Sequence, residues 1–150
     1  MRDVYWDEPD FIIVDMPPGT GDVALTVAQM IPKAEALVVT TPQADAARVA
    51  LKAGKMAVQA HLKVAGVVEN MAYAQCPECG EQLQIFGGDG GDRVAGELGT
   101  EVMGRIPIVA DATGEPGRSL FEVDSTPARV FDEMAATLAA SKVRRRIKVL

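Results

Sequence analysis

The sequence has little of the residue types that mark a membrane protein, a secreted scaffold or a histidine-dependent enzyme. Its 150 residues include two cysteines and one histidine, and aromatic residues make up 5% of the chain. No apolar run approaches the roughly 20 residues of a transmembrane helix. The N-terminal residues are partly acidic and lack the pattern of a secretory signal. We therefore expect a soluble protein of the cytoplasm, without a membrane partner, where thiols are kept reduced.

Side chains for common acid–base or nucleophilic catalysis are also scarce. No Ser–His–Asp arrangement suggests itself, and the single histidine, His61, is expected to lie on the surface or to cap a helix end. A net charge of -6 disfavours broad electrostatic binding to nucleic acid. The basic cluster Arg144–Arg146 with Lys148 follows an expected helix, where positive charge complements the helix C-terminus.

What is present is an alternation of apolar strands with helices. Such alternation predicts an α/β domain in three layers, with a mostly parallel sheet covered by helices on both faces, over residues 1–150 as one domain. The expected strands are 11–14, 36–40, 64–70 and a short one within 101–107, and the expected helices are 23–30, 45–60, 91–98 and 126–143. Residues 71–90 are expected to form a long loop, and long loops in compact domains are usually functional.

Both cysteines stand in that loop, in the run Cys76-Pro77-Glu78-Cys79-Gly80. A CxxC pair supplies half of a four-ligand zinc or iron–sulfur site, and the simplest source of the other half is a second copy of the chain. Pro77 restricts the turn and Gly80 lets the backbone fold around a metal-bound sulfur. Spacing alone does not separate iron from zinc. A redox role is less favoured, since nothing places Cys76 at a helix N-terminus.

A second group of candidate residues follows the ends of the expected strands. Asp15 ends the first strand and enters a loop, Pro17–Asp22, in which Gly19 and Gly21 allow backbone N–H groups close to an anion. An acidic residue in this place commonly holds Mg²⁺ beside nucleotide phosphates. Thr40 and Asn70 end two further strands and are expected to share one crevice with Asp15. The alternatives are that Asp15 caps a turn and that Asn70 is a strand-end turn residue.

Taken together, these motifs resemble the Mrp/ApbC family of iron–sulfur cluster carrier ATPases, which belong to the P-loop NTPases of the deviant Walker A class. The resemblance covers about residues 4–140, and the pairing of the Pro-Pro-Gly-Thr-Gly-Asp loop with CxxC is specific to that family among its ATPase relatives. The segments that carry it are 10–22, Thr40-Thr41-Pro42-Gln43, Val67-Val68-Glu69-Asn70-Met71, Cys76-Pro77-Glu78-Cys79-Gly80 and Ile85-Phe86-Gly87.

The resemblance implies a role for each of these sites. It implies a homodimer in which Cys76 and Cys79 of two subunits hold a bridging 4Fe-4S cluster, to be passed to apo iron–sulfur proteins. For ATP with Mg²⁺, Asp15 would be the switch residue that senses the metal and the γ-phosphate, within a loop that moves between nucleotide states. Asn70 would recognise adenine, and Pro107 with its neighbour Ile106 would wall the base pocket.

The chain departs from the family in one respect. It contains no Gly-x-x-x-x-Gly-Lys-Ser/Thr loop, and its only Gly-Lys pair, Gly54-Lys55, is followed by Met56 within an expected helix. The sequence therefore resembles the C-terminal portion of a carrier, without the first βα unit. We expect no meaningful ATP hydrolysis by this chain alone, because the missing loop supplies most of the phosphate cradle. We also expect an exposed apolar edge or face on the sheet.

Two other functions remain open at this point. One is a zinc-linked dimerisation module without catalysis, which CxxC alone would allow. The other is a partitioning-type ATPase that binds DNA or a surface, which the acidic composition and the CxxC both disfavour.

Overall fold

The computed structural model describes residues 5, 7, 9–17, 21–31, 33–76, 78–109, 119 and 124–143. Within them, helices and strands alternate along much of the chain. The helices are α1 (Asp22–Met30), α2 (Ala44–Gln59), α3 (Gly90–Leu98) and α4 (Thr126–Val143), and the strands are β1 (Glu35–Thr40), β2 (Lys63–Gln75), β3 (Gln82–Leu83) and β4 (Val102–Ile108). None of these helices is both long enough and apolar enough to span a membrane.

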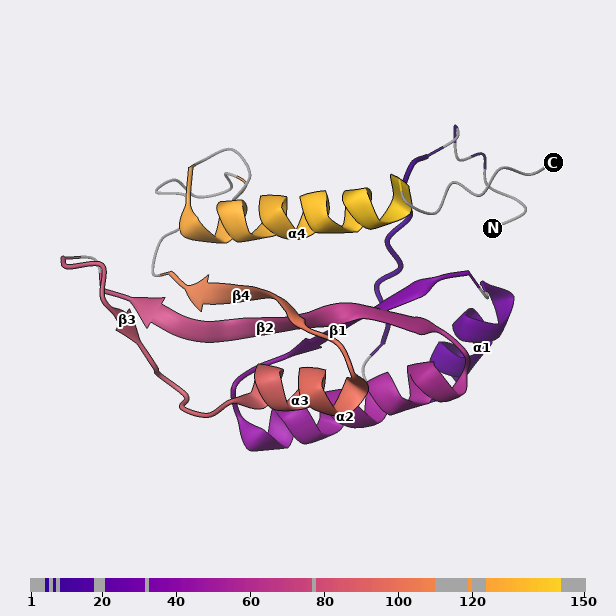
Figure 1. Ribbon diagram of the computed structural model, residues 1–150, viewed down its shortest axis with the longest axis horizontal. Helices are drawn as coiled ribbons and strands as arrows, with labels where there is room; N and C mark the ends of the chain where they lie inside the picture. Colours follow the sequence, from indigo (N-terminus) through magenta and orange to yellow (C-terminus); the bar gives the residue numbers. More distant parts are fainter. Residues whose placement is uncertain are drawn as a thin grey trace.

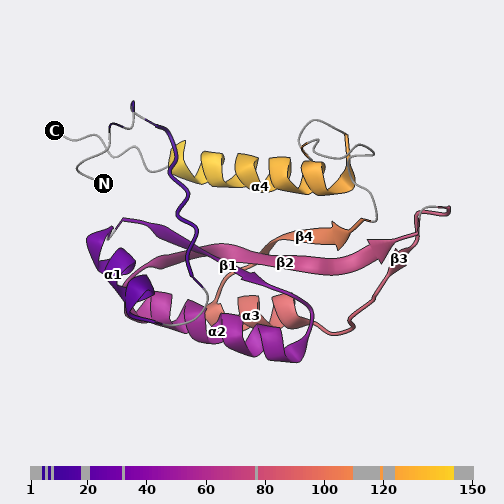
Figure 2. The same ribbon diagram turned by 180° about the vertical axis from the view of Figure 1, so that it is seen from behind.

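Strand β2 is the centre of the sheet, and β1 and β4 run parallel to it on its two sides. Val67 of β2 lies opposite Val38 on one side and Val102 on the other, while β3 pairs antiparallel with the last residues of β2. Helices α2 and α3 cover one face and α4 lies over the other (Figures 1 and 2). The three-layer α/β arrangement with a mostly parallel sheet is thus confirmed.

Small apolar side chains hold the α2 and α3 layer close to the sheet. The core on this face consists of Val38, Ala47, Ala50, Val67, Val94 and Ala95, all buried. On the other face, Gly104 of β4 leaves room for Met134 of α4, because a Cβ on Gly104 would lie 2.6 Å from the Met134 sulfur. Small side chains on one face and a glycine opposite Met134 on the other thus let the helices pack directly on the strands.

The cysteine segment is more regular than expected, because β2 continues to Gln75. The register of β2 against β4 shifts between Asn70 and Ala74, where Met71 adopts a φ of +55°. After this irregularity, Ala74 pairs with Ile108 of β4 and with Leu83 of β3. The expected loop over residues 71–90 is therefore wrong in its first half, which is a β hairpin with the cysteines at its turn.

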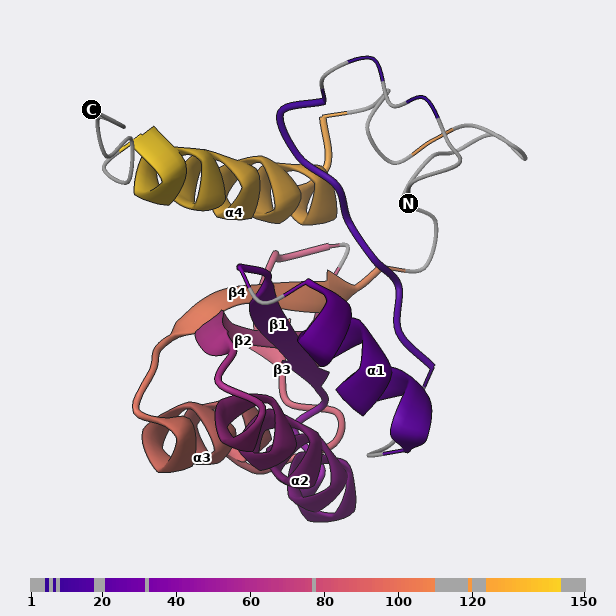
Figure 3. The ribbon, with the colours of Figure 1, turned by 90° about the vertical axis from the view of Figure 1, so that its right-hand side faces the viewer.

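The expected strand over residues 11–14 is also wrong. These residues belong to no strand, and the exposed fractions of Phe11, Ile13 and Val14 are 53%, 94% and 43%. Figure 3 shows segment 9–17, in indigo, passing outside the β1 side of the sheet. An apolar run becomes a strand only when ladder hydrogen bonds join it to a neighbour, and among the described residues no strand pairs with this segment. Helix α1 begins one residue before the expected start at 23, and Gly21 is its N-cap.

Strand β1 forms an apolar edge of the sheet. Among the described residues it pairs with β2 alone. Its residues Leu37 and Val39 are 41% and 57% exposed, since α4 lies over β4 and does not cover β1. The prediction of an exposed apolar sheet edge is confirmed.

Candidate functional site

The cysteines lie at the turn between β2 and β3, at the opposite end of the molecule from α1 (Figures 1 and 2). The Cys76 N–H donates to the carbonyl of Glu81, and the Gly80 N–H donates to the carbonyl of Cys76, each at 2.9 Å. Gly80 has a φ of +75°, a conformation that glycine adopts without strain. Cys76 is half-buried, Cys79 is exposed, and both are free thiols. The turn is thus closed by backbone hydrogen bonds and presents its sulfur atoms at the surface.

The same turn favours the thiolate form of Cys76. Backbone N–H groups of Cys79 and then Glu78 donate toward its sulfur, and these hydrogen bonds lower the pKa of Cys76 below its ordinary value. Hydrogen bonds to the charged form of a group stabilise that form. Metal ions bind the thiolate and not the thiol, so the turn suits a metal or cluster ligand.

The donor set is two sulfur atoms. No group of three or more His, Cys, Asp or Glu side chains in the described ranges is arranged to hold a metal ion. The single histidine, His61, is exposed just beyond the C-terminus of α2, as expected for a surface residue. Thiolate donors suit zinc or an iron–sulfur cluster, and both normally take four ligands. The part of the chain that the structure describes therefore offers half of such a site.

Gln75 connects the cysteine turn to α4. Its side-chain Nε2 donates to the Gly80 carbonyl at 3.5 Å, and its Oε1 accepts from the Thr126 hydroxyl at 3.3 Å. Ser125 in turn accepts the Ala128 N–H at 3.2 Å in the first turn of α4. The position of the turn is thereby linked to the N-terminal end of the helix that covers the sheet.

The strand ends bring together part of the expected nucleotide site. Asn70 lies opposite Ile106 in the β2–β4 register, so it is a close neighbour of the buried Pro107. Asn70 is half-buried, and its Oδ1 accepts the Met71 N–H at 2.9 Å. Thr40, at the end of β1, lies opposite Glu69. The sequence predicts that Asn70 ends its strand. In the structure β2 continues to Gln75, and Asn70 lies at the irregularity within it.

The other residues expected at the nucleotide site are Asp15, Gly19 and Gly21, and the structure describes two of them. Asp15 lies in the exposed segment 9–17, outside the sheet. Residues 18–20 of its loop fall outside the described residues. Gly21 is the N-cap of α1, where its carbonyl accepts the Ala24 and Leu25 N–H groups at 3.1 and 3.4 Å. Gly19 falls outside the described residues.

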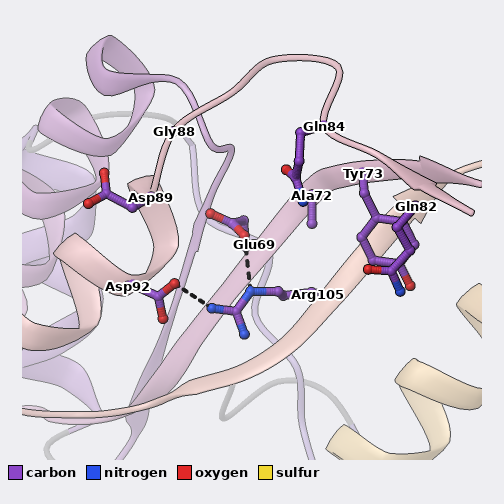
Figure 4. Close-up of a pocket in the computed structure, with 9 residues that line it drawn as sticks. All are labelled: Glu69, Ala72, Tyr73, Gln82, Gln84, Gly88, Asp89, Asp92 and Arg105. Atoms are coloured by element: carbon purple, nitrogen blue, oxygen red, sulfur yellow. Dashed lines mark hydrogen bonds and ion pairs between the residues drawn. The ribbon is translucent and has the colours of Figure 1, made fainter.

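A pocket of about 440 Å³ opens beside this region, between β2, the hairpin and the start of α3, and Figure 4 shows its lining. Glu69 is buried there. Its carboxylate accepts the Gly91 N–H at 2.7 Å and pairs with Arg105 at 3.3 Å, while Arg105 contacts Asp92 at 2.6 Å. The carboxylates of Asp92 and Glu69 raise the pKa of Arg105. A buried carboxylate needs such partners, so this network fixes the start of α3 to β2.

Sequence reasoning missed Glu69 and Arg105. The available signal was a charged residue inside each of two otherwise apolar strands, at Val67-Val68-Glu69 and at Gly104-Arg105-Ile106. Charged residues are almost never fully buried unless they are paired. A charged residue inside an apolar strand therefore predicts a partner of opposite charge, although the sequence alone does not identify that partner.

Glycines let the return segment of the hairpin pack closely on the loop after β1. A Cβ on Gly88 would lie 2.7 Å from the Pro42 carbonyl oxygen, and one on Gly90 would lie 2.5 Å from that of Thr41. Real Cβ atoms do not approach so closely, so both positions need glycine. The segment that leads from the hairpin to α3 is thus held directly against the loop at Thr41 and Pro42.

Curated relatives of this chain are iron–sulfur cluster carrier proteins by name. That of Mycobacterium leprae is 51% identical over 114 residues, which are 72% of this chain and 30% of the relative. That of Bacillus subtilis is 48% identical over 107 residues, 71% of this chain and 30% of the relative. That of Pyrococcus horikoshii is 42% identical over 141 residues, 92% of this chain and 48% of the relative.

A solved structure resembles the fold as well. It is the nucleotide-binding protein of Archaeoglobus fulgidus in complex with ADP, 31% identical, with a TM-score of 0.54 over 90% of this chain and 49% of that chain. This chain thus spans between about a third and a half of the length of these relatives. Residues 1–140 match the family described as the NUBPL iron-transfer P-loop NTPases. The chain belongs to this family, in agreement with the Mrp/ApbC resemblance of its motifs.

Proposed function

We propose that this chain is the cluster-binding portion of an iron–sulfur cluster carrier, a single partial P-loop domain over residues 1–150. Its cargo is a 4Fe-4S cluster held by Cys76 and Cys79. The observation that carries the proposal is the closed turn in which backbone N–H groups favour the Cys76 thiolate. The curated relatives named as iron–sulfur cluster carrier proteins support iron over zinc as the metal.

The number of cysteine ligands per chain supports a homodimer. The chain has two cysteines, and a cluster of this type takes four thiolates, so two copies that meet at their cysteine turns complete the set. The turn lies at an end of the molecule, with Cys79 exposed. A cluster shared between two surface turns is accessible to the thiols of an apo iron–sulfur protein, and transfer to such a recipient follows by ligand exchange.

Adenine nucleotide is the second ligand that we propose, bound as ATP with Mg²⁺. Asn70 beside Pro107 would offer its amide to the base. Asp15, Gly19 and Gly21 would bind the phosphates and Mg²⁺, as the family resemblance implies. The ADP-bound neighbour from Archaeoglobus fulgidus supports a nucleotide site in this fold. Asn70 lies within β2, and β2 ends at Gln75, the residue before Cys76. Nucleotide binding at Asn70 would therefore act on the cysteine turn through a single strand.

The cysteine variants test the proposal. After anaerobic reconstitution with ferrous iron and sulfide, we expect Cys76→Ala and Cys79→Ala each to lose cluster binding, measured as iron and sulfide per chain and as the visible absorption of the cluster. His61→Ala is the matched control and should bind as the parent does, since His61 is exposed and not a ligand.

Two results would overturn the assignment. One is unchanged iron and sulfide in both cysteine variants. The other is stoichiometric zinc, without iron, in protein purified under anaerobic conditions, which would identify a zinc-linked dimerisation module instead.

A further inference from the structure

Apolar side chains remain exposed on the segment that leaves the cysteine turn. Leu83, Ile85 and Phe86 are 46%, 53% and 40% exposed, and we call these three residues the hairpin patch. Leu83 of β3 pairs with Ala74 of β2. Glu81, whose carbonyl accepts the Cys76 N–H and closes the turn, lies five residues before Phe86, the last residue of the patch. At about 3.3 Å per residue, the whole patch lies within about 17 Å of the turn.

Exposure of three large apolar side chains within four residues is unusual for a short surface segment. Single exposed apolar residues are normal, whereas a group beside a candidate site marks an interaction surface. The other side of this segment is fixed in place, because Gly88 and Gly90 pack on the Thr41 and Pro42 carbonyls. The patch is therefore presented by a backbone with a defined position.

We propose that the hairpin patch is the apolar part of the surface on which a second copy of this chain docks, completing the thiolate site. This inference rests on the shared cluster proposed above. In a twofold dimer, a contact made by one copy is repeated by the other, so segments beside the axis face their own equivalents. With Cys76 and Cys79 at the axis, the segment carrying the hairpin patch follows the turn directly and can meet its own equivalent.

Charge at the turn makes an apolar contribution necessary. Glu78 and Glu81 are exposed on either side of Cys79, and thiolate ligands add further negative charge. Two copies of such a turn repel each other across a twofold axis, and this repulsion decays only over about 10 Å at 0.1 M salt. Metal–sulfur bonds and burial of apolar area both oppose this repulsion, and the hairpin patch supplies exposed apolar area beside the turn.

The experiment compares two double variants of the chain. Ile85→Ser with Phe86→Ser alters the hairpin patch, and Val49→Ser with Val58→Ser alters two α2 residues of similar exposure, 58% and 50%, away from the turn. Each protein is reconstituted anaerobically with ferrous iron and sulfide, and its mass is followed by sedimentation velocity over a concentration series. Circular dichroism and urea unfolding establish that each variant is folded. If the double variant is unfolded, Ile85→Ser alone replaces it.

We expect the loaded parent protein and the α2 variant to be dimers of equal affinity. The patch variant should show a dimer dissociation constant at least tenfold higher, and it should lose its cluster faster to a chelator. An unchanged dissociation constant in the folded patch variant overturns this inference and leaves the shared cluster standing. A parent protein that takes up no iron, or that stays monomeric when fully loaded, overturns the proposed function itself.

Discussion

The sulfur of Cys76 accepts hydrogen bonds from the turn that surrounds it. Backbone N–H groups of Cys79 and Glu78 point toward it and lower its pKa. These donors belong to the turn itself, so the effect exists before any metal binds. The turn is in this sense organised in advance for a thiolate ligand, which reduces the reorganisation needed when a cluster arrives.

We expect Cys76 in reduced, metal-free protein to react with iodoacetamide at lower pH when the protein is folded than when it is unfolded in urea. A lowered pKa means that the thiolate, which is the nucleophile, persists at pH values where an ordinary thiol is protonated. Timed alkylation over a pH series, with peptide mass spectrometry, gives the reaction midpoint of Cys76 in each state. The midpoint should rise on unfolding, because the backbone hydrogen bonds are gone. An unchanged midpoint would contradict the hydrogen-bond pattern of the turn.

Residues were predictable from sequence where their chemistry is local. Cys76 and Cys79 are recognised by their spacing, and the structure places them together in one turn. Glu69 and Arg105 were not recognised, because their pairing exists only once β2 and β4 lie side by side. The sequence predicts a strand end at Asn70, because nothing in it marks the irregularity that lets β2 continue past this residue.

Among the elements, the helices with clear periodicity were predicted best. The expected helix over 126–143 coincides with α4, and the one over 45–60 differs from α2 by one residue at each end. An amphipathic pattern lies within the helix itself, so the helix and its buried face can be predicted without knowing which distant segments pack against it. The apolar run at 11–14 failed for the opposite reason, since a strand is defined by its neighbour. Strand β3, two residues long, is too short to leave a pattern.

The contact between α3 and the loop after β1 provides a test at the scale of elements. We expect Gly90→Ala to lower the free energy of unfolding by about 1–3 kcal/mol, because its Cβ would overlap backbone carbonyls that cannot move aside. Gly96→Ala in the same helix is the matched control. Nothing lies within 4 Å of a Cβ there, so higher helix propensity should stabilise the protein by about 0.5–1 kcal/mol. Urea unfolding measures both values, and equal effects would mean that the close approach is absent in solution.

In the molecule as a whole, two separate surfaces expose apolar side chains. The cysteine turn and the hairpin patch occupy one end, while the open edge of the sheet lies along β1. The sequence predicted an exposed apolar edge, but not which strand would form it, because that depends on the order of strands in the sheet. Leu37 and Val39 are exposed on this strand, and both residues point to the face that α4 leaves uncovered. Association through this edge would be independent of metal, in contrast to the dimer at the cysteine turn.

We therefore expect Val39→Lys to reduce self-association of the metal-free protein at high concentration. A lysine on an edge strand adds charge where another chain would otherwise pair or pack. The free energy of unfolding should change by no more than about 1 kcal/mol, since Val39 is 57% exposed. Val58→Lys on α2 adds the same charge at a site that is 50% exposed and away from the edge, so it separates the local effect from the change in net charge. Light scattering over a concentration series should fall for Val39→Lys alone. An equal fall in both variants would attribute association to net charge and not to the β1 edge.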